Sequence, residues 1–114
     1  MTVKRADDVP ARPVEIDGAV GVEIRLLIHE ADDAPNFYMR QFDVAPGGCT
    51  PLHQHAWEHE VYVLAGAGVA VGPDGDCPVA AGDCVFVAGG DRHQFRNTGE
   101  ATLKFLCLVP KTAQ

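Results

Sequence analysis

The amino-acid sequence predicts an all-β fold made of a single domain. Twelve glycines and eight prolines are spread along 114 residues at short intervals, as is typical of short strands joined by many turns. Over ten or more residues, apolar side chains nowhere recur with the 3.6-residue period of a helix. At 46% hydrophobic residues the chain can bury one core. We therefore expect roughly eight to ten strands in a sandwich or barrel.

The first half of the chain alternates strand segments with turns. Residues 22–29 and 36–45 indicate strands, separated by a polar turn over residues 30–35. Pro46-Gly47-Gly48 is expected to end the second strand. Residues 1–13, which contain two prolines, are expected to form an extended arm that packs on the domain or on a neighbour.

The second half continues the same pattern. Residues 60–64 combine β-branched and aromatic side chains, which favour a strand. Residues 72–75 carry a turn signal between two short strands, and residues 98–100 are expected to turn the last hairpin. Further strands are expected at residues 69–71, 84–87, 93–97 and 102–109. The whole chain is thus expected to be one domain.

Composition excludes two classes of partner. A net charge of −7 with scattered basic residues argues against a nucleic-acid-binding surface. The longest apolar stretch, residues 61–72, is broken by three glycines and is far shorter than a membrane span.

The four cysteines show no C-x-x-C spacing, and the N-terminus lacks the apolar segment of a signal peptide. We expect a cytoplasmic domain with reduced cysteines.

Four of the five histidines have the spacing of a metal site. His53 and His55 are two residues apart, so on a strand their imidazoles share one face, and His59 has the same parity. His93 follows 34 residues after His59. Neutral imidazole is the commonest side-chain ligand of first-row transition metals. An isolated histidine in a strand is more often structural, and His29, which lacks such company, is interpreted in that way.

The glycines around these histidines resemble the two motifs of the cupins, which are all-β jelly-roll barrels, or double-stranded β-helices, with a metal at the centre. The second motif, G-x5-P-x-G-x2-H-x3-N, matches four residues in register and has Ala88 in place of proline. These four are Gly82, Gly90, His93 and Asn97. The first motif, G-x5-H-x-H-x3/4-E-x6-G, begins at Gly47.

The carboxylate position of the first motif falls on either His59 or Glu60. With three intervening residues it falls on His59, and the closing glycine is Gly66. With four it falls on Glu60, and the closing position is Ala67. The glycine register and strand parity both favour His59, since Glu60 would face away from the other histidines.

The chain is most similar to small single-domain cupins with a four-histidine manganese site. The segments that carry this resemblance are Asn36-Phe37, Met39-Arg40, Pro46-Gly47-Gly48, His55-x-Trp57-Glu58-His59-Glu60 and Phe105-Leu-Cys-Leu108. It implies a homodimer and a divalent metal, manganese first, with iron, copper, nickel or zinc as alternatives. The metal would be held by His53, His55, His59 and His93, with two adjacent positions open.

Four other side chains are candidates for the wall of the pocket. On the last strand Phe105 and Cys107 belong to the odd-numbered face, which is expected to point inward. They either face the metal, as the resemblance implies, or are plain core residues. Trp57 either covers the metal loop or stacks on a ligand. Arg40 either orients an anionic or phenolic substrate or pairs with an acidic neighbour.

The resemblance and the ligand set point to an enzyme. We expect a metal-dependent oxygenase, or dioxygenase, that binds O₂ beside a small aromatic or enolic substrate and cleaves a C=C or C–C bond. One alternative is a module that binds a metal or metabolite without turnover. The other is an isomerase that uses the metal as a Lewis acid, with Glu60 or another carboxylate as the base. Cupins host many chemistries, so the fold alone does not choose among these.

Overall fold

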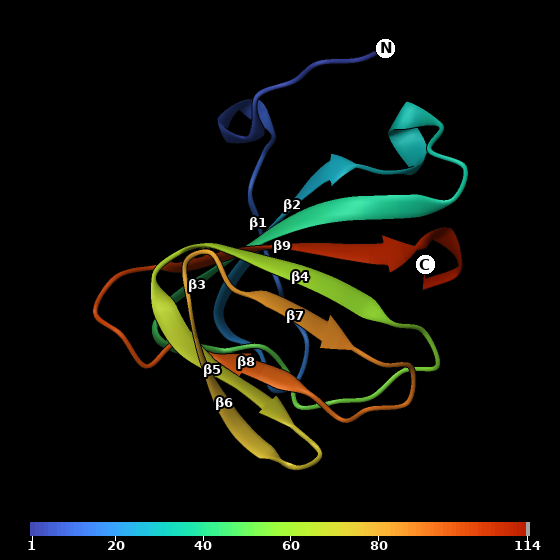
Figure 1. Cartoon of the computed structure of the whole chain (residues 1–114). Coiled ribbons are helices and arrows are strands. Elements are labelled where there is room, and N and C mark those ends of the chain that lie inside the picture. Colours follow the sequence, from blue (N-terminus) through green and yellow to red (C-terminus); the bar gives the residue numbers. More distant parts are fainter. Residues whose placement is uncertain (114) are drawn as a thin grey trace.

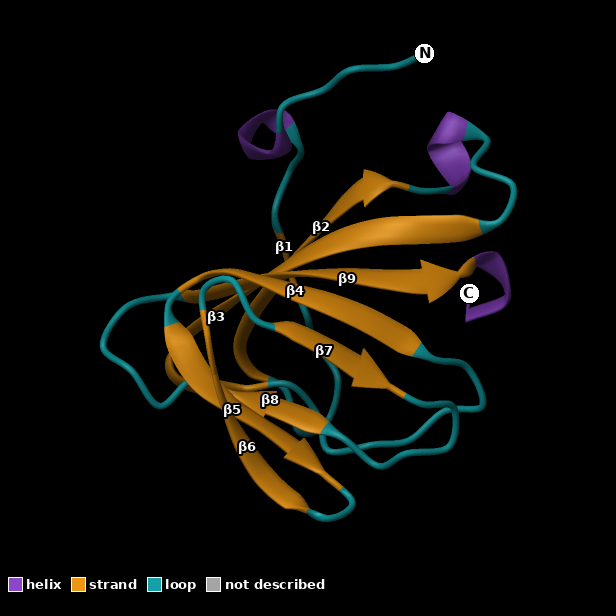
Figure 2. Cartoon of the chain, in the orientation of Figure 1, coloured by secondary structure: helices purple, strands orange, loops and turns teal. Residues whose placement is uncertain are grey.

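The structure is a computed structural model in which residues 1–113 are described. Strands dominate it, as Figure 2 shows, and the all-β prediction is confirmed. Three short 3-10 segments, η1 to η3, cover Ala6–Asp8, Glu30–Asp32 and Lys111–Ala113. The strands β1 to β9 cover Arg12–Pro13, Val20–Ile28, Phe37–Cys49, His59–Ala65, Ala67–Gly72, Gly75–Ala80, Cys84–Val87, Gln94–Arg96 and Leu103–Pro110. Over residues 1–113 no helix is long and apolar enough to cross a membrane.

The strands form one sheet that curls on itself into an open half-barrel (Figure 1). Its order is β6-β5-β8-β3-β9-β4-β7, and β2 pairs with the other side of β3 and with β1. The pairings that join these strands are antiparallel. Such curling brings residues far apart in the sequence onto one concave face.

Strand β3 does not end where the sequence indicated. It continues through Pro46-Gly47-Gly48 to Cys49, whose partner is Arg96 on β8. Gly47 has a φ of 79°, and a Cβ on Gly48 would collide with the carbonyl oxygen of Val20. The glycines therefore let the strand bend at a close crossing and continue, because neither position tolerates an ordinary side chain.

The inner face of the sheet holds the core. Burial alternates along β4 and β9, and the odd-numbered residues of β9 are buried, as predicted. The ring of Phe105 lies between those of Phe42, 5.3 Å away, and Phe95, 4.8 Å away. Val44 and Leu103 pair across β3 and β9 and are fully buried.

The N-terminal residues lie against the outside of β2. The Arg25 guanidinium donates to the carbonyl oxygens of Ala6, Asp7 and Val9 at 3.2, 3.3 and 2.8 Å. Lys4 forms an ion pair with Asp32 at 2.7 Å. This segment contains η1 and the two residues of β1, so it is not extended throughout.

Candidate metal centre

The curled sheet gathers four imidazole rings at one place. The backbones of His53 and His93 exchange two hydrogen bonds, of 3.1 and 2.9 Å, in an isolated bridge. The ligand atoms of His53, His55 and His93 lie within 4.8 Å of one another, so these three can hold a metal ion. The first residue of β4, His59, extends the cluster: its ring centre is 4.8 Å from that of His93 and 5.1 Å from that of His55.

The two most buried rings each have one nitrogen anchored. The Nδ1 of His93 lies 2.9 Å from the carbonyl oxygen of Asp91, which can only accept, so Nδ1 carries the hydrogen. The Nδ1 of His59 lies 3.2 Å from the Sγ of Cys107. The other nitrogen of His59, Nε2, is buried and has no hydrogen-bond partner among residues 1–113. A buried nitrogen without a partner, beside three histidines that can hold a metal ion, fits a bound cation, which would use its lone pair.

Burial favours the neutral form of three of the rings, those of His53, His55 and His59. It lowers the pKa of His53 to about 4 and that of His59 to about 3, and the neighbouring imidazoles and Arg40 add to both shifts. The pKa of His55 is lowered for the same main reason. A metal binds only the unprotonated ring, so the lowered pKa values of His53, His55 and His59 favour metal binding by these three rings.

The histidines form one wall of a largely apolar cavity of about 380 Å³. Arg40 lines it with its guanidinium carbon 5.1 Å from the centre of the Phe42 ring. Trp57 stacks on His55 at 4.5 Å with an interplanar angle of 12°, so it covers a histidine ring. Phe105 and Cys107 line the same cavity. All four predicted wall residues therefore meet there.

Comparison with known proteins agrees with this geometry. The family model described as "Cupin domain" matches residues 40–109, which span both histidine motifs. This chain is a cupin. It is 34% identical to the oxalate-binding protein of Thermotoga maritima, over 96% of this chain and 93% of that protein.

Two further relatives differ in what their names describe. The structure of the polyketide cyclase RemF from Streptomyces resistomycificus superposes with a TM-score of 0.92 and 37% identity, over 97% of this cupin and 80% of that chain. The 1-methylthio-D-xylulose 5-phosphate methylsulfurylase of Rhodospirillum rubrum is 39% identical over 71 residues, which are 62% of this cupin and 46% of that protein. The family of this chain is thus shown, whereas the names of these three relatives describe different functions.

The residue after His59 lies outside the cavity of this cupin. Glu60 is exposed on the opposite face of β4 and lines a separate pocket with Phe37 and Pro110. His59 is 7% exposed and faces inward. The structure thus places the side chains as strand parity predicts, and the role of His59 as a ligand stays a prediction.

Sequence reasoning missed the hydrogen-bond partners of the histidine rings. Asn97, the last residue of the second motif, donates to the carbonyl oxygens of Val44 and Ala101, both at 2.8 Å, and so holds the β8–β9 turn. The observed partners are the Asp91 carbonyl and the Cys107 sulfur. The cavity also receives Val14, Glu15 and Ile16 from the N-terminal segment, a contribution without any local sequence signal.

Proposed function

We propose that this cupin binds a divalent transition metal through His53, His55, His59 and His93 and acts on a small ligand with two chelating oxygens. The observation that carries the proposal is the cluster of four histidines, two of them buried, on the wall of a largely apolar cavity. Four neutral ligands leave the full charge of the metal in place, and an octahedral ion keeps two positions open. When bound, the metal would supply Lewis acidity to a carbonyl or enolate oxygen.

The relatives support this ligand class. Oxalate, named for the Thermotoga maritima relative, offers two oxygens to one metal ion, and so do the 1,3-dioxo units of a polyketide chain. The aromatic wall formed by Phe42, Phe95 and Phe105 suits a flat carbon skeleton better than a sugar. We therefore favour cyclisation of a polyketide-type substrate as the reaction.

In that reaction the side chains of this chain have separable tasks. The aromatic wall holds the carbon skeleton and excludes water, and Trp57 keeps the His55 ring in place by stacking. The guanidinium of Arg40 adds a positive charge to the lining of the cavity and can hold an enolate or phenolate oxygen. Glu15 lines the mouth and is a carboxylate that can accept a proton there.

The direct test uses oxygen chelators of two shapes. Untagged protein loaded with Mn²⁺ or Zn²⁺ is titrated with acetylacetone and with oxalate, and binding is followed by calorimetry. We expect binding that requires the metal and disappears in His93→Ala. Metal binding that no substitution of these four histidines weakens would overturn the proposal. Ligand binding without turnover of a poly-β-ketone would instead support the binding-module alternative.

An oxygenase is the second candidate, and the aromatic cavity beside a carboxylate-free ligand set favours it. A neutral ligand set is expected to stabilise the lower oxidation state, because no anionic ligand donates electron density to the metal. O₂ uptake by the manganese- or iron-loaded protein with aromatic alkenes or enols tests it. An absence of uptake with every such substrate would leave the Lewis-acid reaction. The preference for manganese and the homodimer stay predictions, tested by metal analysis and by light scattering.

A further inference from the structure

The sulfur of Cys107, a residue that lines the cavity, has a nitrogen atom of another residue on each of two sides. It is 3.2 Å from His59 Nδ1 and 3.2 Å from an Arg40 Nη2. The three residues come from adjacent strands β3, β9 and β4, and Cys107 pairs in register with Arg40 on one side and with Val61 on the other. His59 is two residues before Val61 and so shares its face. The sheet register therefore aligns the three side chains.

The possible roles of these atoms determine the direction of the hydrogen bonds. A guanidinium can only donate, so the contact with Arg40 has sulfur as its acceptor. If the thiol donated to His59 Nδ1, the ring hydrogen would be on Nε2, which is buried without a partner among residues 1–113. A buried N–H without an acceptor is costly. The favoured arrangement has Nδ1–H donating to sulfur and leaves a lone pair on Nε2.

The neighbouring His93 shows the same arrangement with an oxygen acceptor. Its Nδ1 is held by the Asp91 carbonyl at 2.9 Å, which leaves its Nε2 available. Metal-binding histidines generally need such a partner, which fixes the tautomer and the orientation of the ring. His59 has a sulfur where a carbonyl or carboxylate is usual. Cys107 is 4% exposed, so water does not compete for this contact.

We propose that Cys107, held in place by Arg40, is the positioning residue of His59 and directs its Nε2 toward the metal. The inference rests on the proposed four-histidine site, since it assigns Nε2 of His59 to the ion. It gives Cys107 a role in metal affinity rather than in contact with the substrate. The same role explains why the charged side chain of Arg40 lies on the inner face of β3.

The test is a double-mutant cycle with Co²⁺ affinity and the visible Co²⁺ spectrum as readouts. Cys107→Val fills the space without an acceptor, and Cys107→Ser keeps an acceptor. We expect Cys107→Val to weaken Co²⁺ binding about 10- to 100-fold, as loss of a partner of a ligand histidine does, and to change the spectrum as His59→Ala does. Cys107→Ser should restore most of the affinity. In the His59→Ala background Cys107→Val should have no further effect.

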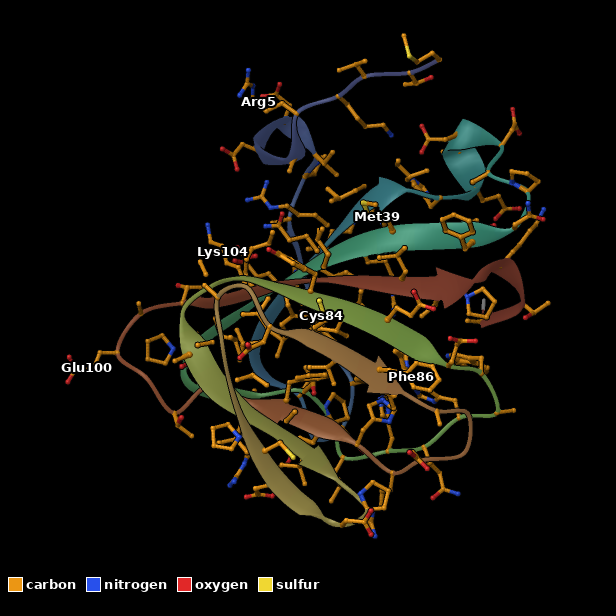
Figure 3. The ribbon with its side chains drawn as sticks, viewed as in Figure 1. Arg5, Met39, Cys84, Phe86, Glu100 and Lys104 are labelled. Atoms are coloured by element: carbon orange, nitrogen blue, oxygen red, sulfur yellow. The ribbon has the colours of Figure 1, made fainter. Side chains whose placement is uncertain are left out.

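The controls separate positioning from packing. If Cys107 only packs the core, valine and serine would lower affinity in both backgrounds alike, and the inference would be wrong. The exposed Cys84 on β7, labelled in Figure 3, gives the matched variant Cys84→Ala, which should leave Co²⁺ affinity and spectrum unchanged. If His59→Ala itself leaves the affinity unchanged, the four-histidine site fails first. If His59→Ala weakens binding and Cys107→Val does not, only the positioning role fails.

Discussion

Two ends of the same three strands have opposite characters. At one end, which we call the packed end, Val44 of β3, Val63 of β4 and Leu103 of β9 are at most 1% exposed. At the other end, which we call the histidine end, the inner face of these strands carries Arg40, His59 and Cys107. Arg40 and His59 each have one buried nitrogen that lacks a hydrogen-bond partner among residues 1–113. The packed end stabilises the fold, and the histidine end places unsatisfied groups where a ligand can use them.

Phe105 lies between the two ends, and its removal should have the largest effect on stability. Phe105→Ala would leave a cavity between Phe42 and Phe95 and lower the free energy of unfolding by about 3–5 kcal/mol. Urea denaturation of the metal-free protein measures it. A change below about 1 kcal/mol would mean that the aromatic wall is not part of the packed core.

At the histidine end, His59→Ala should affect metal binding far more than folding. We expect metal affinity to fall by more than about a hundredfold, since loss of a ligand exceeds the loss of a ligand's partner. Calorimetric titration with Mn²⁺ or Co²⁺ measures it. The neighbouring Glu60→Ala, on the outer face, is the matched control and should bind normally. The reverse result would assign the fourth ligand to Glu60.

Metal binding should stabilise the fold through the histidine end alone. At a free metal concentration ten times Kd, the free energy of unfolding should rise by about 1.4 kcal/mol, because the metal binds the folded state. Phe105→Ala should show the same increment, provided it folds, whereas His59→Ala should show much less at that concentration. Equal increments in both variants would place the ion elsewhere.

The pH dependence of the unfolding free energy of the metal-free protein should also distinguish the two ends, by a smaller effect than the preceding substitutions. The pKa values of His53 and His59 are lowered in the folded state to about 4 and about 3, so the unfolded chain takes up these protons first. Stability from these rings is therefore present above the ordinary histidine pKa near 6.5 and decreases as pH falls toward those values. Urea denaturation at several pH values gives the unfolding free energy as a function of pH. The slope of this dependence should be shallower in His59→Gln and unchanged in Leu103→Ala.

Local pattern predicted most of the strands and the alternation of faces along β4 and β9. It did not place His53 and His55, which were expected to share one face of a strand but lie between β3 and β4, outside both strands. The predicted strand 84–87 agrees with β7, and the prediction for 102–109 differs from β9 by one residue at each end. Alternation has a period of two residues, so the odd-numbered face of β9 could be assigned without tertiary information. The same parity argument separated His59 from Glu60. The prediction that residues 46–48 end the second strand was wrong, because a glycine bend can continue a strand as well as end it.

The candidate site divides in the same way. Spacing within the chain predicted the four-histidine set, and motif glycines chose its third member. Only the tertiary structure brought the Cys107 sulfur to His59, 48 residues away, and to Arg40, 67 residues away. Those contacts depend on how β3, β9 and β4 pair in register, and strand pairing is a long-range choice that no local pattern encodes. The sequence by itself predicted which residues could bind a metal, and the register of the sheet decided which side chains contact them.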